Sequence, residues 1–521
     1  MNPKIWHTPG WPGDLTALFA GALVTLSLAP YSMWVLGMLA TTVLASLLTG
    51  LNGKRGFLRS FFFGIGLYGS GASWVYVSIY NFGLSSAPLA FALTSAFVIA
   101  LALVFALPFY FYSRFLERSR WGFLLGFPAI WVLGEWSRTW FLTGFPWLFL
   151  GYSQHSTWLS GWAPVIGVNG LSFILVLTGV VLANTFYQAI NCLSKDEDSA
   201  PHCQPRTTLA LLFITCLCWA GGATLRDVNW TQARDEPVSV AVVQPNIPQE
   251  MKWNPMYRGY INQTLRDLAK PHWGTQLMIW PEAAIPVMYQ DADLIFEEIE
   301  MQSAIKPTAV LTGILYEDEA NQQYYNSIVG LAEAEGTYFK QRLVPFGEYV
   351  PLESTLRGII SFFDLPTSII SPGPKNQALI KTDAYDIATS ICYEVVYPDL
   401  VAEYAAKSQV IVTISNDAWF GDSIGPLQHF EMARMRALEN GRYLIRGTNT
   451  GISGIITPKG EVQSATAQFK QTVLTDEVYL YDGVTPFGAS GSWPIVTLCI
   501  LLCGFIVVII RRKSTVAPTA Q

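Results

Sequence analysis

Charged residues are scarce in the first 225 residues of this 521-residue chain, which hold only 16 of its 70 Asp, Glu, Lys and Arg residues. Between Thr139 and Asn191 the sequence contains no charged residue. A helix needs about 20 mostly apolar residues to cross the hydrocarbon core of a bilayer, and runs of this kind recur through the first half. The rest of the chain is richer in charge. The sequence therefore predicts a membrane domain followed by a water-soluble domain.

The overall composition excludes two other classes of protein. Disordered chains combine low hydrophobicity with high net charge, and nucleic-acid binders carry basic patches. Here 51% of the residues are hydrophobic, 13% are charged and the net charge is −6. We therefore expect an ordered chain with no nucleic-acid partner.

Eight apolar segments are candidate transmembrane helices, so the predicted membrane part is a polytopic α-helical domain of about eight spans. The first two are short and separated by only a few residues, which makes that pair the weakest. The segments lie near 14–29, 32–50, 57–79, 87–112, 121–140, 164–190, 207–223 and 492–510.

The basic residues between these segments predict the orientation, because cytoplasmic loops carry an excess of Lys and Arg. Alternate connections contain such residues, whereas those around 81–86 and 141–163 contain none. The basic residues are Lys54, Arg55, Arg59, Arg114, Arg118, Arg120, Lys195 and Arg206, with Arg511, Arg512 and Lys513 after the last span. We expect both termini in the cytoplasm of a bacterium, a multi-pass protein of the inner membrane, and residues 226–490 in the periplasm. The predicted domains are 1–225 with seven spans, 226–490, and 491–521 with the eighth span and a cytoplasmic tail.

Cysteine placement singles out one thiol. Cys192 and Cys203 fall in a predicted cytoplasmic loop, and four others fall within spans, so only Cys392 belongs to the exported domain. A lone cysteine in an oxidising compartment is a candidate reactive thiol. The alternative is a buried, inert cysteine, which is the commoner fate of a free thiol.

Residues 226–490 alternate between strand-like and helix-like segments, which predicts an α/β layered domain. This stretch has 19 basic and 32 acidic residues, so its charge does not attract it to anionic lipid. The expected strands are 238–243, 276–280, 309–315, 326–331, 387–391 and 410–415, and the expected helices are 255–270, 291–305, 398–407 and 426–442.

Three reactive side chains fall at strand-like runs. Glu282 and Cys392 follow the ends of expected strands, and Lys340 lies within the run 338–343. A cysteine nucleophile needs a base to remove its proton, and a nearby ammonium favours the thiolate and stabilises an oxyanion. The alternatives are a surface carboxylate at Glu282 and a solvated edge strand at Lys340.

The motifs around these residues resemble the nitrilase, or carbon–nitrogen hydrolase, superfamily. They are WPE at 280–282, KQRLVPFGEYVP at 340–351, ICYE at 391–394 and SNDAWFGDSIGPLQH at 415–429. With the eight spans, QPNIPQEMKW at 244–253 and WVLGEWSRTWFLTGFPWLFLGYSQ at 131–154, the whole chain resembles the bacterial apolipoprotein N-acyltransferase family. The resemblance implies an αββα sandwich and a triad of Glu282 as general base and acid, Lys340 for oxyanion stabilisation and Cys392 as nucleophile.

The same resemblance implies the activity. Such an enzyme transfers a fatty acyl chain, expected from the sn-1 position of a phospholipid, to the α-amino group of the N-terminal S-diacylglyceryl cysteine of an apolipoprotein. It proceeds through a thioester on the cysteine, as the last step of lipoprotein maturation. The expected partners are the phospholipid donor and the diacylated acceptor, no cofactor is expected, and the resemblance suggests a monomer.

Further residues are assigned through the resemblance. Glu348, Tyr393 and Glu394 are expected to support the triad, and Trp253 to lie in a mobile loop over the site. The alternatives are an ion pair between Glu348 and Arg342 and an interfacial aromatic anchor at Trp253. Asn416 and Trp419 are expected to be structural, and His429 to pack or form hydrogen bonds, since no metal-ligand spacing is present.

Glu135 and Arg138 lie three residues apart in a predicted span and share a helix face. Ionisable residues within a span are candidates for function, and the alternative is a mutual ion pair. The uncharged aromatic stretch 145–162 could line the route of lipid to the site.

Two other functions fit parts of the sequence. A membrane-tethered amidase of the nitrilase type would use the same three residues on a small amide, although a soluble substrate does not require eight spans. A transporter or scaffold with an inactive exported domain is the second alternative, against which the intact Glu282, Lys340 and Cys392 argue.

Overall fold

The chain forms two compact units in the computed structural model. The structure describes residues 10–83, 86–193, 205–345, 347–349 and 370–516. We call residues up to 74, 91–228 and from 492 onward the helical unit, and residues 75–90 together with 229–491 the sandwich unit. Lys195 and Cys203 of the predicted cytoplasmic loop, and Phe346, Val350 and Pro351 of the motif at 340–351, lie outside the described residues.

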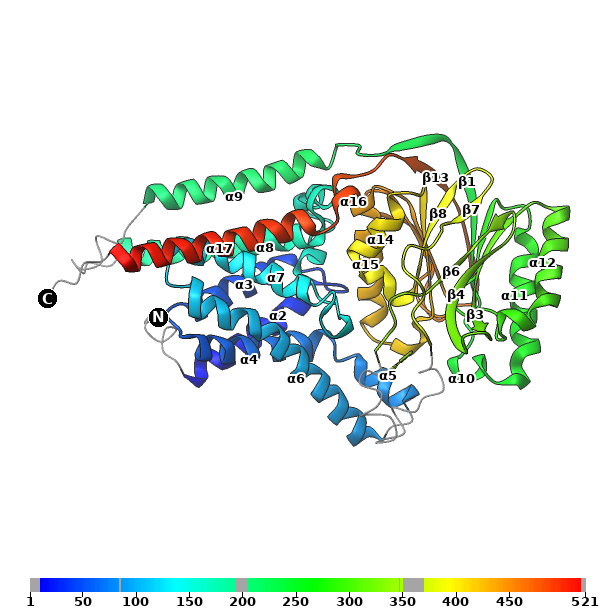
Figure 1. Ribbon diagram of the computed structural model, residues 1–521, viewed down its shortest axis with the longest axis horizontal. Helices are drawn as coiled ribbons and strands as arrows, with labels where there is room; N and C mark the ends of the chain where they lie inside the picture. The colour runs from blue at the N-terminus through cyan, green and yellow to red at the C-terminus, as the bar shows by residue number, and fades with distance from the viewer. Residues whose placement is uncertain (1–9, 84–85, 194–204, 346, 350–369, 517–521) are drawn as a thin grey trace. The chain divides into compact units, whose positions relative to one another are not determined.

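The helical unit has a helix in each of the eight apolar segments, coloured from blue to cyan, in green and in red in Figure 1. Two π-helical turns adjoin these helices: Tyr112–Leu116 directly follows the helix Ala87–Phe111, and Gly122–Gly126 directly precedes the helix Phe127–Ser137. The helices are α2 (Trp11–Ser27), α3 (Trp34–Leu48), α4 (Gly53–Gly71), α6 (Ala87–Phe111), α7 (Phe127–Ser137), α8 (Ala163–Leu193), α9 (Pro205–Leu225) and α17 (Trp493–Val516). The first four residues of α6, 87–90, belong to the sandwich unit.

Four of the described helices are long and apolar enough to cross a membrane. They are Ala87–Leu116, Trp158–Ala189, Arg206–Leu225 and Trp493–Arg512. The expected count of eight spans is therefore not confirmed. At about 1.5 Å per residue, the 15 residues of α3 are shorter than the roughly 30 Å hydrocarbon core. Helix α4 is lengthened by a charged first turn that contains Lys54 and Arg55.

Ionisable side chains inside the helical unit bind the protein itself. Arg59 is fully buried within α4; its Nε lies 3.2 Å from Oδ1 of Asp14, and its Nη1 donates to the carbonyl of Leu47. Because Arg59 is buried and paired within the helix bundle, it is not one of the basic loop residues that indicate orientation.

Glu135 and Arg138 both hold the backbone of the segment that follows α7. Oε1 of Glu135 accepts from the backbone N–H of Leu150 at 2.8 Å, and Nη1 of Arg138 donates to the carbonyl of Trp147 at 2.8 Å. The guanidinium also lies over the ring of Phe149. These contacts favour a role in anchoring 147–150 over the mutual ion pair that the helix spacing suggested.

The sandwich unit consists of two mixed sheets that pack face to face. The six-stranded sheet has the order β13-β1-β2-β3-β4-β6, and the seven-stranded sheet has the order β12-β11-β10-β9-β8-β7-β5. Gly447 of the second sheet lies against Ile279 and Val242 of the first, where a Cβ atom would come within 3.0 Å of Ile279. The facing side chains of the two sheets are therefore closely packed at this position.

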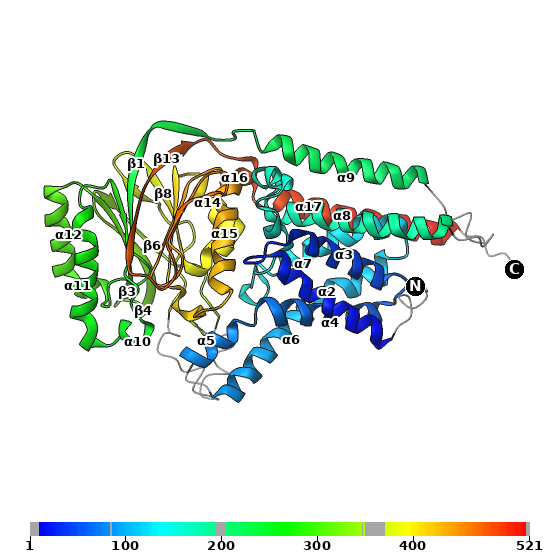
Figure 2. The ribbon, with the colours of Figure 1, turned by 180° about the vertical axis from the view of Figure 1, so that it is seen from behind.

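Helices cover the outer face of each sheet, as Figure 1 and Figure 2 show from opposite sides. Helices α11 (Arg258–Ala269) and α12 (Asp293–Ile305) pack on the first sheet through buried residues such as Ile261, Leu265 and Ile299. Helices α14 (Pro398–Ala405) and α15 (Gly425–Asn440) cover the second sheet. The expected αββα sandwich is confirmed.

Most expected strands and helices are present, with shifted ends. The first-sheet strands are β1 (Gln232–Gln244), β2 (Leu277–Ile279), β3 (Ala309–Asp318), β4 (Gln323–Ala332), β6 (Thr337–Phe339) and β13 (Thr472–Asp482). The second-sheet strands are β5 (Ala334–Glu335), β7 (Ile380–Thr382), β8 (Asp386–Ile391), β9 (Val410–Ser415), β10 (Leu444–Thr448), β11 (Gly454–Ile456) and β12 (Val462–Ala465). Lys340 was expected within a strand, but β6 ends at Phe339.

One short helix from the first hundred residues belongs to the sandwich unit. Helix α5 (Val75–Phe82) packs on the turn Asp417–Phe420 that follows β9. The hydroxyl of Ser78 donates to the carbonyl of Trp419 at 2.7 Å, and the rings of Phe82 and Trp419 are 5.1 Å apart. Trp419 therefore joins α5 to the sandwich, in line with the structural role expected for it.

Candidate active site

Strand ends bring Glu282, Lys340 and Cys392 together between the two sheets. Glu282 lies three residues after β2, Lys340 directly follows β6, and Cys392 directly follows β8. The carboxyl ends of parallel strands meet at one edge of a sheet, where α/β proteins assemble their sites. β8 and β9 are parallel, with Ile391 opposite Ile414, so the residues after both strands share this edge.

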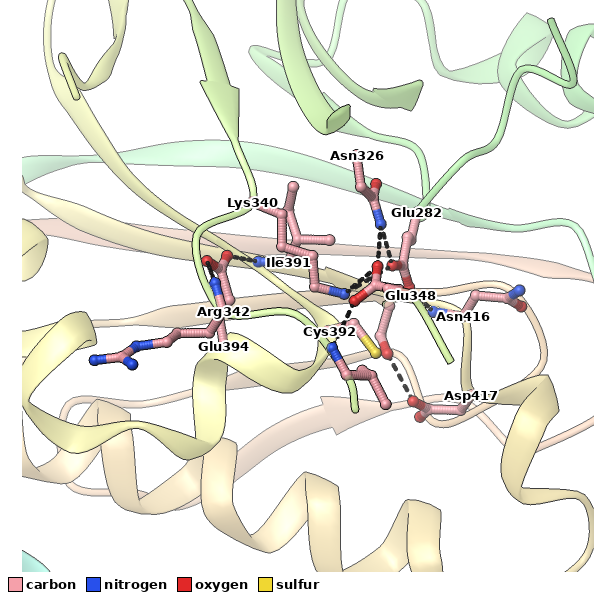
Figure 3. Close-up of polar contacts among 12 residues, drawn as sticks. Glu282, Asn326, Lys340, Arg342, Glu348, Ile391, Cys392, Glu394, Asn416 and Asp417 are labelled. Atoms are coloured by element: carbon pink, nitrogen blue, oxygen red, sulfur yellow. Dashed lines mark hydrogen bonds and ion pairs between the residues drawn. The ribbon is translucent and has the colours of Figure 1, made fainter. Parts of the chain in front are cut away.

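Three elements hold the carboxylate of Glu282 (Figure 3). Oε1 accepts from Nδ2 of Asn326 at 2.7 Å and lies 3.5 Å from Nζ of Lys340. Oε2 accepts from the backbone N–H of Asn416 at 2.7 Å. Asn416 thus contacts the site directly, beyond the structural role expected for it, and Asn326 was not predicted at all.

Lys340 is buried between two carboxylates. Its Nζ donates to Oε1 of Glu348 at 2.9 Å and approaches Oε1 of Glu282 at 3.5 Å, and its side chain is 1% exposed. Although burial opposes the charged form, Glu348 and Glu282 raise the pKa of Lys340 above its ordinary value, so the amine stays an ammonium. Glu348 also accepts from Asn326 and from the backbone N–H of Val344. The structure therefore places Glu348 beside Lys340.

Cys392 has a left-handed backbone conformation, with φ of 51°. Such a conformation costs a non-glycine residue about 1–3 kcal/mol and persists where the surrounding structure enforces it. Burial, together with the negative charge of Glu282, raises the pKa of the Cys392 thiol to about 12, against the opposing effect of Lys340. The resting group is therefore a thiol, and its proton has to be removed when it attacks.

Glu394 holds the backbone on both sides of the site. Oε2 accepts from the N–H of Ile391 at 2.8 Å, and Oε1 accepts from the N–H groups of Gln341 and Arg342 at 2.6 and 3.1 Å. Burial raises the pKa of Glu394 to about 7, and these backbone donors oppose the rise. One carboxyl group thus ties the residue before Cys392 to the residues after Lys340.

The other predicted residues lie nearby in different surroundings. Tyr393 is buried, with its ring 5.4 Å from that of Tyr397. Arg342 lies over the Tyr397 ring at 5.0 Å, a contact in place of the ion pair considered for Glu348. Trp253 is 38% exposed and directly follows the short helix α10 (Gln249–Lys252). Tyr393 is thus part of the packing around the site, whereas Trp253 lies at the surface.

A buried ionic cluster lies beside Cys392, and sequence reasoning did not predict it. Arg446 donates to Oδ2 of Asp417 at 2.8 Å, and Ser415 donates to Oδ1 at 2.7 Å. Nδ1 of His429 lies 3.2 Å from Oδ1 of Asp417, and its Nε2 lies 3.0 Å from the carbonyl oxygen of Cys392. His429 therefore forms hydrogen bonds, as expected, and one of them is to the backbone of Cys392.

Among the residues that the structure describes, no group of three or more His, Cys, Asp or Glu side chains could hold a metal ion. The side chains that meet at the site are a carboxylate, an ammonium and a thiol. This set can perform proton transfer, oxyanion stabilisation and nucleophilic attack on a carbonyl carbon.

Comparison with known families defines the class of the sandwich unit. Residues 239–482 match the family model described as Carbon-nitrogen hydrolase. Residues 20–181 match a second model, described as Apolipoprotein N-acyltransferase N-terminal domain. The two models thus cover most of both units.

Relatives match over nearly the full length. A protein of Pseudomonas paraeruginosa, named apolipoprotein N-acyltransferase, is 43% identical over 497 residues, which cover 94% of each chain. Proteins of the same name from Pseudomonas putida and Methylococcus capsulatus are 43% and 35% identical, over 98% and 96% of this chain and 100% and 97% of theirs. The chain belongs to the apolipoprotein N-acyltransferase family.

Proposed function

We propose that this protein transfers a fatty acyl chain from a phospholipid to the α-amino group of the N-terminal S-diacylglyceryl cysteine of apolipoproteins. Membership of the family supports the activity. The observation that supports the proposed reaction is the buried cluster of Glu282, Lys340 and Cys392, which follow the ends of three different strands. Four of the described helices are long and apolar enough to cross a membrane, which is consistent with a lipid donor.

The first half of the reaction acylates Cys392. As the sulfur attacks the sn-1 ester carbonyl, Glu282 takes the thiol proton, because the raised pKa of the thiol leaves little thiolate beforehand. The ammonium of Lys340 stabilises the oxyanion; it has three N–H donors, and among the described residues Glu348 and Glu282 occupy two of them. Collapse of the intermediate breaks the ester bond, and Glu282 returns its proton to the leaving lysophospholipid oxygen.

The second half transfers the chain to the lipoprotein. The α-amine attacks the thioester carbon, Glu282 accepts a proton from the amine, and Lys340 again faces the oxyanion. The C–S bond breaks, the sulfur regains a proton from Glu282, and an amide is released. Glu348, Tyr393 and Glu394 support the triad through the contacts described above, and Trp253 covers the site from its exposed turn.

Localisation follows from the same proposal. We place the protein in the bacterial inner membrane as a multi-pass monomer, with eight spans, both termini in the cytoplasm and the sandwich unit in the periplasm. The distribution of Lys and Arg between apolar segments supports this orientation.

Incubation of purified protein with phospholipid alone tests the covalent step. We expect one fatty acyl mass on Cys392 and about one equivalent of lysophospholipid, after which the reaction stops. Neutral hydroxylamine should remove the adduct, and a diacylated lipopeptide should remove it while forming the triacylated product. Full turnover with Cys392 never modified would contradict the thioester and indicate direct transfer within a ternary complex.

The same preparation separates the alternative functions. Release of ammonia from small amides, with no acyl transfer from phospholipid, would identify a tethered amidase. Full biological function of Cys392→Ala would identify a scaffold.

A further inference from the structure

The four-residue helix α10 is linked to the candidate base, Glu282, by one direct and one indirect contact. At its end, Nζ of Lys252 donates to the backbone carbonyl of Glu282 at 2.8 Å. At its start, Oε1 of Gln249 accepts from Nδ2 of Asn416 at 2.7 Å. The backbone N–H of Asn416 is the donor to Oε2 of Glu282. One helical turn therefore reaches the backbone of Glu282 directly and its carboxylate through one intermediate residue.

Lys252 is an unusual residue for this position. It is 3% exposed, and lysine is almost never fully buried without a partner. Among the described residues, its one hydrogen-bond partner is the Glu282 carbonyl. Burial lowers the pKa of Lys252 to about 8, and Glu282 and Cys392 oppose this change, which places the amine within electrostatic reach of both.

The backbone that Lys252 holds is strained. Ala283, directly after Glu282, has φ of 45°, in the left-handed region that non-glycine residues seldom occupy. Two backbone hydrogen bonds join this turn to Gly313 of strand β3. The N–H of Ala284 donates to the carbonyl of Gly313, and the N–H of Gly313 donates to the carbonyl of Pro281. These bonds fix the residues on either side of Glu282, whereas the Glu282 carbonyl itself is held by Lys252. A strained turn persists only where surrounding contacts enforce it.

We propose that helix α10 clamps the general base of the acyl-transfer reaction, with Lys252 and Gln249 as positioning residues that fix the backbone and the carboxylate of Glu282. Lys252 sets the position of the Glu282 carbonyl, and Gln249 orients Asn416, whose N–H orients Oε2. This role rests on the proposed function, in which Glu282 is the base of both half-reactions.

Single-turnover acylation by phospholipid tests the clamp. Lys252→Met keeps most of the aliphatic stem and removes the donor. We expect it to slow formation of acyl-Cys392 roughly 10- to 100-fold, as for loss of a hydrogen bond to a buried group. The phospholipid concentration at half-maximal rate should stay unchanged, because Lys252 contacts the base and not the lipid. A residue that only stabilised the fold would lower the fraction of active protein without slowing acylation in the molecules that remain folded.

Three further variants make the result decisive. Lys270→Met, at an exposed lysine, is the matched control and should acylate at the wild-type rate. Gln249→Leu removes only the contact to Asn416 and should slow acylation less than Lys252→Met; it also serves if Lys252→Met does not fold. The double variant should lose less than the product of the two single losses, because both contacts act on one group.

Glu282→Gln separates the two proposals. If Glu282→Gln acylates normally, Glu282 is not the base and the proposed function is wrong at that residue. If Glu282→Gln is inactive while folded Lys252→Met and Gln249→Leu both acylate at the wild-type rate, the clamp is wrong and the base assignment stands. An increase in the half-saturating phospholipid concentration at an unchanged maximal rate would also overturn the clamp, since it would make Lys252 a lipid contact.

Discussion

Nε2 of His429 lies 3.0 Å from the carbonyl oxygen of Cys392, and both groups are buried. Burial and the guanidinium of Arg446 lower the pKa of His429, and the carboxylate of Asp417 opposes this change. A carbonyl only accepts hydrogen bonds, so the contact at Nε2 requires a ring hydrogen on that nitrogen, while Nδ1 lies 3.2 Å from Oδ1 of Asp417 and 3.0 Å from Nη2 of Arg446. His429 thus donates to the backbone of Cys392, whose φ is 51°.

We predict that this hydrogen bond contributes to the rate of Cys392 acylation. His429→Asn should slow acylation roughly 10- to 100-fold, because the shorter amide leaves a buried carbonyl unsatisfied. His429→Gln should retain more activity, because its amide nitrogen can occupy the place of Nε2. Single-turnover acylation, measured beside the thermal unfolding of each variant, checks the prediction. Equal losses in the two variants would show that the hydrogen bond to Cys392 is not what matters.

The simplest prediction concerns the three residues of the proposed triad. Cys392→Ala, Glu282→Gln and Lys340→Ala should each abolish formation of the triacylated lipopeptide while the protein remains folded and inserted in the membrane. Loss of one oxyanion donor costs about 3–4 kcal/mol, which is roughly a 100- to 1,000-fold loss at Lys340. Cys392→Ser should also be inactive, since a hydroxyl is far less readily ionised than a thiol. Near-normal transfer by any of these variants would remove that residue from its proposed role.

The sequence predicted those features of the sandwich that depend on local pattern. Alternating strand and helix segments predicted the layers, and reactive residues at strand ends predicted that Glu282 and Cys392 meet. The partners of Glu282 were not predictable in this way. Asn326 and Asn416 lie 44 and 134 residues away from it, and one of them acts through a backbone N–H that every residue type provides.

Helix lengths in the helical unit were a different problem. Hydropathy finds apolar segments but not the points at which tertiary packing ends a helix. The segment at 32–50 forms only α3, with 15 residues, and the segment at 121–140 is divided between a π-helical turn and the 11 residues of α7. Arg59 was counted among the basic loop residues because its pairing with Asp14, 45 residues earlier in the chain, cannot be seen from the local sequence.

Gly313 on β3 provides a test of how Glu282 is positioned. A Cβ atom at this position would lie 2.5 Å from the backbone nitrogen of Ala283 and 2.7 Å from Cα of Glu282. Both are backbone atoms, so Gly313→Ala has to displace the backbone of Glu282 and Ala283. We expect a destabilisation of about 1–3 kcal/mol from overpacking and a fall in acylation rate in the molecules that remain folded.

Gly259 offers the matched control for that substitution. It lies in α11, and a Cβ atom there would meet nothing within 4 Å. Gly259→Ala should leave acylation unchanged and raise stability by up to about 1 kcal/mol, because alanine favours the helix. Thermal unfolding and single-turnover acylation of both variants provide the comparison. Wild-type acylation by folded Gly313→Ala would mean that the turn at Glu282 tolerates displacement.

The proposed orientation predicts where reporter fusions are active. A reporter that functions only outside the cytoplasm should be active when fused near Asn246 and inactive when fused after Lys513. Fusions at both positions to a reporter that is active only in the cytoplasm should give the opposite pattern and serve as the control. If the two patterns were exchanged, the orientation deduced from the Lys and Arg distribution would be wrong.

The pH dependence of Cys392 labelling tests its electrostatic surroundings without any lipid. Burial and Glu282 raise the pKa of the thiol to about 12, so the reactive thiolate is a small fraction at neutral pH. The labelling rate of the Cys392 peptide by iodoacetamide should therefore rise about tenfold per pH unit without levelling off up to about pH 10, whereas an ordinary thiol levels off above its pKa of about 8.5. The stabilising effect of the buried neutral thiol is fully present below the ordinary pKa and lost as the pH rises toward about 12.

Two variants should change the labelling rate of Cys392 in opposite directions. Glu282→Gln removes a negative charge that raises the thiol pKa, so labelling at a fixed pH should become faster even though acylation by phospholipid is abolished. Lys340→Met removes the ammonium that lowers the pKa, so labelling should become slower. Peptide-resolved mass spectrometry follows Cys392 separately from the cysteines of the helical unit. If Glu282→Gln slowed labelling, Glu282 would be assisting thiolate formation in the resting site, and the attack would begin from a thiol that is already partly ionised.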